Sequence, residues 1–106
     1  MQTPVSLETI RGTIVKRQRA RFVYERRTPM VADLYLLGHA RRSSAYVVMA
    51  WCVEPTPGWR VLRYAEIRDF ERVGPVDVFR GDFDPYDRQI MTIDTQVLNG
   101  GGLRRN

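Results

Sequence analysis

Apolar residues at helical spacing open the chain. The positions that form this stripe are Leu7, Ile10 and Ile14, and Val15 stands beside them. They recur every three to four residues, so one narrow apolar face of a helix would point toward a core. Thr3 followed by Pro4 resembles a helix start, and Ser6 is a competing N-cap. The pattern therefore predicts an N-terminal helix.

After this helix the apolar positions alternate with a period of two, which is typical of strands. The predicted strands are Arg21–Glu25, Met30–Gly38, Ala45–Val53, Trp59–Tyr64 and Glu66–Val73. The third is apolar on both faces, which favours a central place in a closed or covered sheet. Proline- and glycine-containing turns separate the strands. Five short strands with tight connections after one helix predict a small barrel, since closure removes exposed edges.

The pattern beyond residue 76 is weaker. Asp84 before Pro85 resembles another helix start, with Asp87 well placed in the first turn. Apolar residues from Ile90 onward give a sparse helical stripe, which predicts a helix over 85–98. The predicted fold is mainly β with flanking helices: an N-terminal helix, a five-stranded barrel and a C-terminal helical arm. We expect one domain with its core at about 7–75 and an extension over about 76–106.

Composition supports a single globular domain. The chain has 106 residues, of which 43% are hydrophobic and 27% charged, close to the average for soluble proteins. Cys52 is the only cysteine, which excludes an intrachain disulfide, and its apolar neighbours predict a buried thiol. The first residues lack the pattern of a signal peptide. No apolar run approaches the roughly 18 residues of a membrane span, so we expect a cytoplasmic protein that does not contact membranes.

Positive charge is concentrated in the first part of the chain. Residues 1–63 hold 11 basic and 4 acidic residues, a balance of +7, whereas residues 64–106 hold 6 and 8, a balance of −2, which together give the net +5. Lys16 is the only lysine. Arginine suits bidentate contacts with phosphate, and a basic half attracts polyanions. A GC-rich genome would explain the abundance of arginine equally well.

Several basic and aromatic side chains are candidates for contacting an anionic ligand. Arg60 and Arg63 point to opposite faces of a regular strand, and Arg41 and Arg42 follow His39 in a loop between strands. The aromatic residues that could stack on bases are Tyr24, Tyr35, Tyr46, Trp51, Trp59 and Tyr64. The alternative for such residues, above all for Trp51 and Tyr46, is the core of the sheet. Trp59 beside Arg60 makes the strongest local case for binding.

No catalytic constellation is present in the sequence. There is no G-x-S-x-G motif, no P-loop and no Cys–His pair. His39 is the only histidine, so it lacks partners for a metal and offers little acid–base capacity. The series Asp82, Asp84 and Asp87 lacks the glycine and glutamate of a calcium loop, and helix capping explains Asp84 and Asp87 more simply. We expect neither an enzyme nor a bound metal or cofactor.

Several segments share their order and spacing with one known family. A helix and a strand ending in tyrosine precede a central strand that begins with Ala45, Tyr46 and Val47, and the stretch WRVLRYAEIRDF follows it. The positions that match are Ile10, Ile14, Tyr24, Gly38, Tyr46, Arg60, Arg63, Ile67, Asp87 and Met91. In this combination, over residues 7–93, the chain resembles a minimal WYL-domain protein, a stand-alone form of a domain found in many bacterial transcription regulators. Leu34, Ala45 and Glu66 depart from the family pattern, and Glu66 would reverse the charge at a ligand-facing position.

This resemblance implies an Sm-like barrel of the Src-homology-3 type that senses a ligand. The implied ligand is nucleic acid, single-stranded in particular, or a nucleotide. In regulators the signal passes to a winged helix, so without one this chain would act alone, as a homo-oligomer, or with a partner regulator. The predicted contact residues are Tyr24, His39, Arg41, Arg42, Tyr46, Trp59, Arg60 and Arg63. The alternative function is a protein–protein interaction or oligomerisation module without affinity for nucleic acid.

Overall fold

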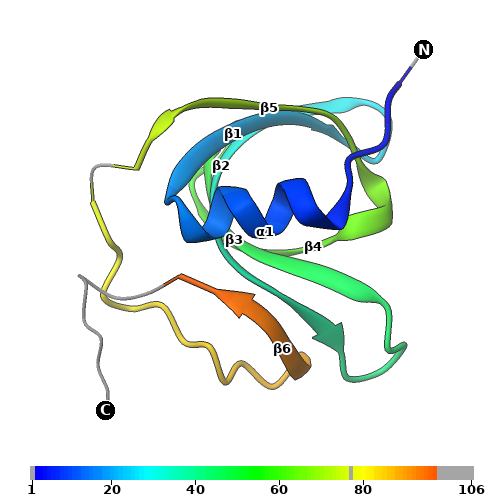
Figure 1. Ribbon diagram of the computed structural model, residues 1–106, viewed down its shortest axis with the longest axis vertical. Helices are drawn as coiled ribbons and strands as arrows, with labels where there is room; N and C mark the ends of the chain where they lie inside the picture. Colours follow the sequence, from blue (N-terminus) through cyan, green and yellow to red (C-terminus); the bar gives the residue numbers. More distant parts are fainter. Residues whose placement is uncertain (1, 77, 98–106) are drawn as a thin grey trace.

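A helix lies across a curved antiparallel sheet in the computed structural model, which describes residues 2–76 and 78–97 (Figure 1). Helix α1 spans Leu7–Val15, so the predicted N-terminal helix is confirmed. Its N-cap is Ser6, whose Oγ accepts the backbone N–H of Thr9 at 3.1 Å. The alternative start at Thr3–Pro4 is wrong, because Pro4 forms an isolated bridge with Arg68.

The five predicted strands are all present, with shifted ends. They are β1 (Gln18–Tyr24), β2 (Thr28–Ala40), β3 (Tyr46–Glu54), β4 (Gly58–Arg63) and β5 (Ile67–Pro75). A short 3-10 turn, η1 (Tyr64–Glu66), joins β4 to β5. Every pairing is antiparallel, and the order along the sheet is β4-β3-β2-β1-β5. The fold is therefore mainly β, as the alternating pattern predicts.

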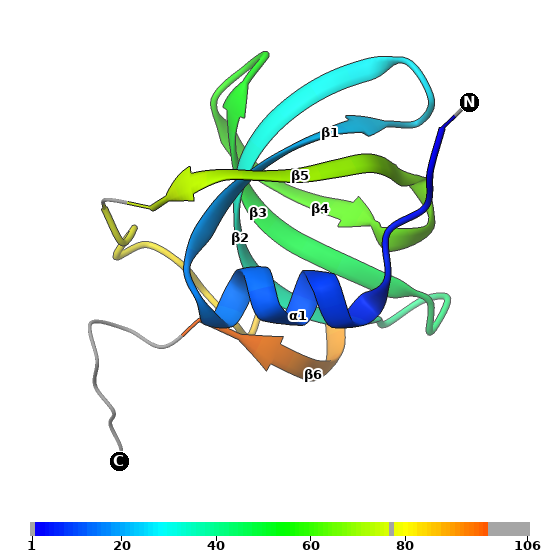
Figure 2. The ribbon, with the colours of Figure 1, turned by 45° about the horizontal axis from the view of Figure 1, so that its top comes forward.

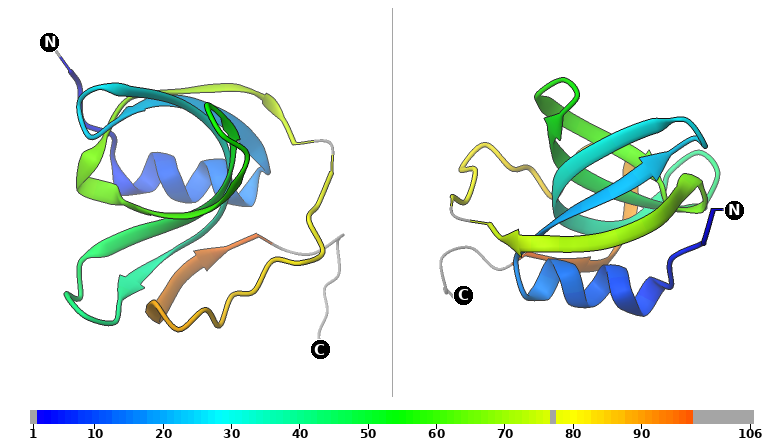
Figure 3. Two further views of the ribbon diagram at one scale, coloured as in Figure 1. Left: turned by 180° about the vertical axis from the view of Figure 1, so that it is seen from behind. Right: turned by 90° about the horizontal axis from the view of Figure 1, so that it is seen from above.

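The end of the described chain is a strand, so the prediction of a C-terminal helix over 85–98 is wrong. Strand β6 (Ile90–Gln96) pairs with β2, and the segment 78–89 that leads to it contains turns but no helix (Figure 3). Residues 77 and 98–106 of the predicted extension, which include the last residue of the predicted helix, lie outside the described residues. Asp84 and Asp87 accept the backbone N–H groups of Tyr86 and Gln89, each at 2.9 Å, in turns rather than at a helix start.

Strand β2 divides one of its edges between two partners. Its first half pairs with β1 from Thr28 to Asp33, and its second half pairs with β6 from Leu36 to Ala40, while β3 runs along the opposite edge. Gly38 lies inside β2, where the pairing with β6 shifts register between Leu37 and Gly38. A Cβ atom at Gly38 would stand 2.3 Å from the backbone oxygen of Thr92. Only glycine allows β6 to approach so closely.

The sheet curls strongly but is not closed by hydrogen bonds into the predicted barrel. The curl is visible in Figures 2 and 3, where β1, β2 and β5 wrap over the interior. Among the described residues no ladder joins β4 to β5, which are connected through η1 instead. Helix α1 lies between β5 and β6 in Figures 1 and 2 and contacts β1, β2 and β6.

The main core lies between α1 and the concave side of the sheet. Ile10, Ile14, Phe22, Leu37 and Val48 are among its residues and are at most 1% exposed. Burial of each such side chain contributes about 1.5–3 kcal/mol relative to exposure. Cys52 also belongs to this core, as predicted for a buried thiol, and its Sγ donates to the carbonyl oxygen of Glu54 at 3.0 Å.

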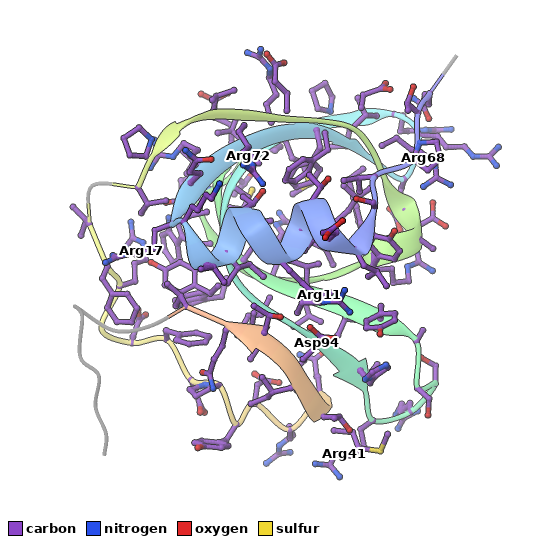
Figure 4. The ribbon with its side chains drawn as sticks, in the orientation of Figure 1. Arg11, Arg17, Arg41, Arg68, Arg72 and Asp94 are labelled. Carbon is purple, nitrogen blue, oxygen red and sulfur yellow. The ribbon has the colours of Figure 1, made fainter. Side chains whose placement is uncertain are left out.

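Arg72 ties α1 to β5. Its Nε donates to Oγ1 of the fully buried Thr13 at 2.9 Å, and that hydroxyl donates in turn to the carbonyl oxygen of Thr9 at 2.8 Å. Figure 4 shows Arg72 between the strand and the helix. A Cβ atom at Gly12 would lie 2.8 Å from Nη2 of Arg72, so the small residue at this helical position leaves room for the guanidinium.

Candidate functional site

A second apolar surface lies on the side of β3 and β4 that faces segment 78–90. Directly opposed pairs align the same face of both strands: Val47 with Arg63, Met49 with Val61, and Trp51 with Trp59. Together with Leu36, Ile90 and Phe83, most of these residues form a small apolar cluster. Segment 78–90 packs over this cluster, and two adjoining cavities remain between the segment and the strands.

The larger cavity, about 500 Å³, is strongly basic. Its charged lining consists of Arg41, Arg42, Arg63 and Arg88, and its apolar floor of Ala40, Val47 and Val61, with Gln89 at one side. No acidic residue lines it among the described residues. A cavity of this size falls in the range of about 300–1,000 Å³ typical of small-molecule sites. We call it the basic cavity.

Arg41 holds the wall of the basic cavity in place. Its Nε donates to the carbonyl oxygen of Arg88 at 3.0 Å, its Nη2 donates to that of Ile90 at 3.4 Å, and its backbone N–H donates to that of Gln89 at 2.9 Å. Figure 4 shows Arg41 beside the start of β6. These donors are occupied, so Arg41 positions residues 88–90 more than it offers donors to a ligand.

Arg63 is held at the rim by Tyr24, the last residue of β1, and by Glu25 in the turn that follows. The backbone N–H of Arg63 donates to the hydroxyl of Tyr24 at 2.9 Å, and its guanidinium pairs with Glu25. Tyr24 first, and then Glu25, raise the pKa of Arg63 above its usual value. The side chains of Arg63 and Glu25 are 61% and 49% exposed, so the pair can exchange readily with other ions.

Arg42 and Arg88 have neither a hydrogen bond nor an ion pair from their guanidinium groups to any part of the chain that the structure describes. Both groups line the basic cavity. A guanidinium without an internal partner keeps all five of its N–H donors for solvent or a ligand.

The smaller cavity, about 230 Å³, has the opposite charge. Asp82, Asp84 and Asp87 line it with Arg60, Trp59 and Met49, and it shares Val61 and Gln89 with the basic cavity. The indole Nε1 of Trp59 donates to Oδ2 of Asp82 at 3.0 Å. We call it the acidic cavity. Arg60 therefore lies among carboxylates, apart from the other predicted arginines.

His39 and Tyr46 lie outside both cavities. Their rings pack 4.3 Å apart between β2 and β3, and Tyr46 packs against the main core. Close to them, Arg11 of α1 makes a bidentate ion pair with Asp94 of β6 at 2.8 and 2.9 Å, and Figure 4 shows the two side chains facing each other. Arg11 first, and then Thr95, lower the pKa of Asp94 to about 2. This group joins α1 to β6 and lines neither of the two cavities.

The aromatic side chains mostly contact one another. Trp59 packs against Tyr35, Trp51 and Phe83 with ring centroids 4.9, 5.5 and 5.9 Å apart. The guanidinium of Arg80 lies 3.5 Å from the centroid of the Trp51 ring, so this ring face is covered by the chain itself. The hydroxyl of Tyr64 donates to the carbonyl oxygen of Val5. Only Trp59 among these aromatic residues lines either of the two cavities.

The predicted contact residues thus separate into three groups. Arg41, Arg42 and Arg63 come together in the basic cavity, with Tyr24 behind Arg63. Trp59 and Arg60 line the acidic cavity, and His39 and Tyr46 lie elsewhere. Sequence reasoning missed Arg88 and Gln89. Both residues lie in the segment predicted as a helix, and the sequence does not indicate that this segment approaches the strands. The path of segment 78–90 in the folded chain brings them there.

Among residues 2–76 and 78–97, no three His, Cys, Asp or Glu side chains come close enough together to hold a metal ion. Within the same residues, no helix has the length and apolar character needed to cross a membrane. No protein-family model matches the chain, and the searches of curated proteins and of solved structures found no significant match.

Proposed function

We propose that this protein is a non-catalytic module that binds an anionic, phosphate-bearing ligand in the basic cavity. The proposal rests on one observation: four arginines and no described acidic residue line a single cavity of about 500 Å³ with an apolar floor. Converging guanidinium groups are the usual means of binding phosphate, because each forms charge-assisted hydrogen bonds with its oxygens.

Each arginine has a distinct role in this proposal. Arg42 and Arg88 supply direct contacts, because their guanidinium groups have no partner among the described residues. Arg63 joins them once it leaves Glu25. Arg41 is a positioning residue that holds the backbone of residues 88–90.

The ligand class follows the resemblance to WYL-domain proteins, which implies a nucleotide or single-stranded nucleic acid. The order of an N-terminal helix and a curled sheet β4-β3-β2-β1-β5 supports the proposal of an Sm-like relationship. The cavity is concave and bounded, which favours a nucleotide or the end of a strand over a long duplex. A regulatory role in the bacterial cytoplasm is part of the same proposal.

We also propose that the module performs no reaction. Catalysis near neutral pH usually needs a general acid or base. The ring of His39 packs on Tyr46 away from both cavities. The lining of the basic cavity is cationic, amide or apolar, so it supports binding and offers no nucleophile.

Binding is tested by titrating GMP and a labelled single-stranded 12-mer at low and moderate salt. We expect both to bind, with the affinity for the 12-mer falling steeply as salt increases, since cationic contacts release counterions. The Arg42→Ala/Arg88→Ala double variant should bind both probes about 10-fold or more weakly, because each lost charged hydrogen bond is worth about 1.5–3 kcal/mol before solvent screening.

The matched control is Arg21→Ala. Arg21 carries the same charge but pairs with Glu71 on β5 at 2.9 Å, away from the cavity, so its loss should change affinity little. No binding of either probe by the wild type at low salt would refute the proposal. Equal losses in the control and the double variant would show that net charge, and not the cavity, carries the binding.

A second candidate function, self-association, is favoured by apolar exposure near β6. Tyr86 is 82% exposed and Met91 48%, and both line a shallow surface depression with Pro85. Such a patch can mark a protein interface. Light scattering of the wild type and of Tyr86→Ser/Met91→Ser tests it: a dimer that the double substitution converts to a monomer supports this function, and a monomeric wild type refutes it.

A further inference from the structure

The two cavities form adjoining ends of one trough, and their charges are opposite. Val61 and Gln89 line both cavities. Along β4, Trp59 lines the acidic end, Val61 lies between, and Arg63 lines the basic end. Alternate residues of a strand lie on one face at intervals of about 6.6 Å, so a ligand spanning the trough would meet both ends.

The charge difference between the ends is large. In the basic cavity the four arginines carry a formal charge of +4, whereas in the acidic cavity three aspartates and Arg60 leave −2. A ligand that is anionic throughout would be repelled at the acidic end. A ligand with a phosphate at one end and hydrogen-bond donors at the other would match both.

The acidic end offers acceptors that the fold does not use fully. Asp84 and Asp87 each direct one carboxylate oxygen to a backbone N–H, that of Tyr86 or of Gln89. Their second oxygens make no hydrogen bond within the chain that the structure describes. An ionised carboxylate only accepts hydrogen bonds, so these solvent-accessible oxygens are available to the N–H or O–H donors of a ligand. Trp59 beside them provides an apolar wall for a flat ring.

From this arrangement we infer that the preferred ligand is a nucleotide whose base carries an exocyclic amino group facing Asp84 and Asp87. This inference rests on the proposed function, because the phosphate end of the ligand is the one bound by the basic cavity. Guanine and cytosine present an amino donor on an edge, and a carboxylate is a suitable partner for it. Uracil presents a carbonyl oxygen at the corresponding position of cytosine, which would face the carboxylates unfavourably.

Two pairs of nucleotides isolate this single group. GMP differs from IMP by the 2-amino group alone. CMP differs from UMP by an amino group in place of a carbonyl oxygen and by an N3 acceptor in place of an N3–H donor, so the purine pair is the stricter comparison. Phosphate, sugar and ring size stay the same within each pair. We expect the amino-bearing member to bind about 5-fold or more tightly in at least the purine or the pyrimidine pair, since a matched base contact discriminates by such factors.

The Asp84→Asn/Asp87→Asn double variant tests the residues. Asparagine keeps a side-chain oxygen for the backbone N–H groups of Tyr86 and Gln89, so the turns should persist, and an unchanged melting temperature verifies this. The variant should bind the two members of the discriminated pair with nearly equal affinity. Its affinity for ribose 5-phosphate, which has no base, should be unchanged or slightly higher because two negative charges are lost.

The possible results separate the inference from the proposed function. If all four nucleotides bind through Arg42 and Arg88 but neither pair is discriminated, the inference is wrong and the phosphate site remains. Discrimination that persists in the double variant also overturns it, since other groups would then read the base. If neither the nucleotides nor ribose 5-phosphate bind, the proposed function fails as well.

Discussion

Replacing Gly38 with alanine should destabilise the protein by forcing β6 away from β2. The added Cβ would stand 2.3 Å from the backbone oxygen of Thr92, and it would approach side-chain atoms of Ile90 and Leu36 at 3.3 Å. Because the first obstacle is backbone, rotation of a side chain cannot relieve it. The strand must retreat by at least about 0.7 Å to reach the 3.0 Å that separates real Cβ contacts from clashes.

The size of the destabilisation follows from the packing of β6 against β2 and from the hydrogen bonds between the two strands. Overpacking a tight site costs about 1–3 kcal/mol, and each backbone hydrogen bond lost from the β2–β6 ladder adds about 1 kcal/mol. For a domain of this size, 1 kcal/mol corresponds to about 4–8 °C in Tm. We therefore expect Gly38→Ala to lower Tm by about 5–20 °C, with faster hydrogen exchange of the β6 amides in particular.

Gly81→Ala is the matched control for this substitution. A Cβ atom added at Gly81 would meet no other atom within 4 Å, and the backbone there does not occupy the left-handed region. Alanine at this position should leave Tm unchanged or raise it slightly through the lower entropy of the unfolded chain. Thermal unfolding of both variants checks the reasoning. An unchanged Tm for Gly38→Ala, with β6 still protected from exchange, would refute the close approach of the two strands.

Two further predictions concern ion pairs. Arg11 lowers the pKa of Asp94 from 3.8 to about 2 in the folded protein. The stabilisation by Asp94 is therefore complete above pH 3.8 and disappears as the pH falls to about 2. The difference in urea midpoint between the wild type and Asp94→Asn should shrink over that window, and a constant difference would contradict the pairing. Removing Glu25 frees Arg63, so Glu25→Gln should tighten GMP binding by only about 2- to 5-fold, since an exposed ion pair is a weak competitor. Glu71→Gln, which breaks the comparable Arg21–Glu71 pair, should leave GMP affinity unchanged. Equal effects of the two substitutions would argue against competition between Glu25 and the ligand for Arg63.

The fold of the first 75 residues was largely predictable because the spacing of their apolar residues matches the faces that the helix and strands bury. The Leu7–Ile14 stripe became a buried helix face, and the alternating segments became β1 to β5. The C-terminal prediction failed for a local reason. Register shifts at Leu37/Gly38 and His39/Ala40 in the β2–β6 pairing break the regular alternation of β6, and Ile90, Ile93 and Val97 then imitate a helical period. The β-branched series from Ile90 to Val97 was the signal that favoured a strand.

The candidate site was predictable only in part. Residue type and position in the sequence predict Arg41, Arg42 and Arg63 as contact residues, and these three arginines do share a cavity. The sequence does not indicate that Arg88 reaches the basic cavity, because this long-range contact depends on how segment 78–90 crosses the strands. The adjacency of Trp59 and Arg60 in the sequence predicts a joint contact, but the carboxylates around them come from that same distant segment.

The divided edge of β2 also has a consequence for how the chain reaches its native alignment. Asp33, only 4% exposed, makes a bidentate pair with Arg19 of β1, and Gly38 lies against the backbone oxygen of Thr92 on β6. Moving β2 by one residue reverses the direction of every side chain. Such a slip would turn Asp33 away from its cation and at the same time press a bulky side chain against the backbone of β6. Asp33 and Gly38 thus each destabilise misaligned pairings of β2, at two separate points of the strand.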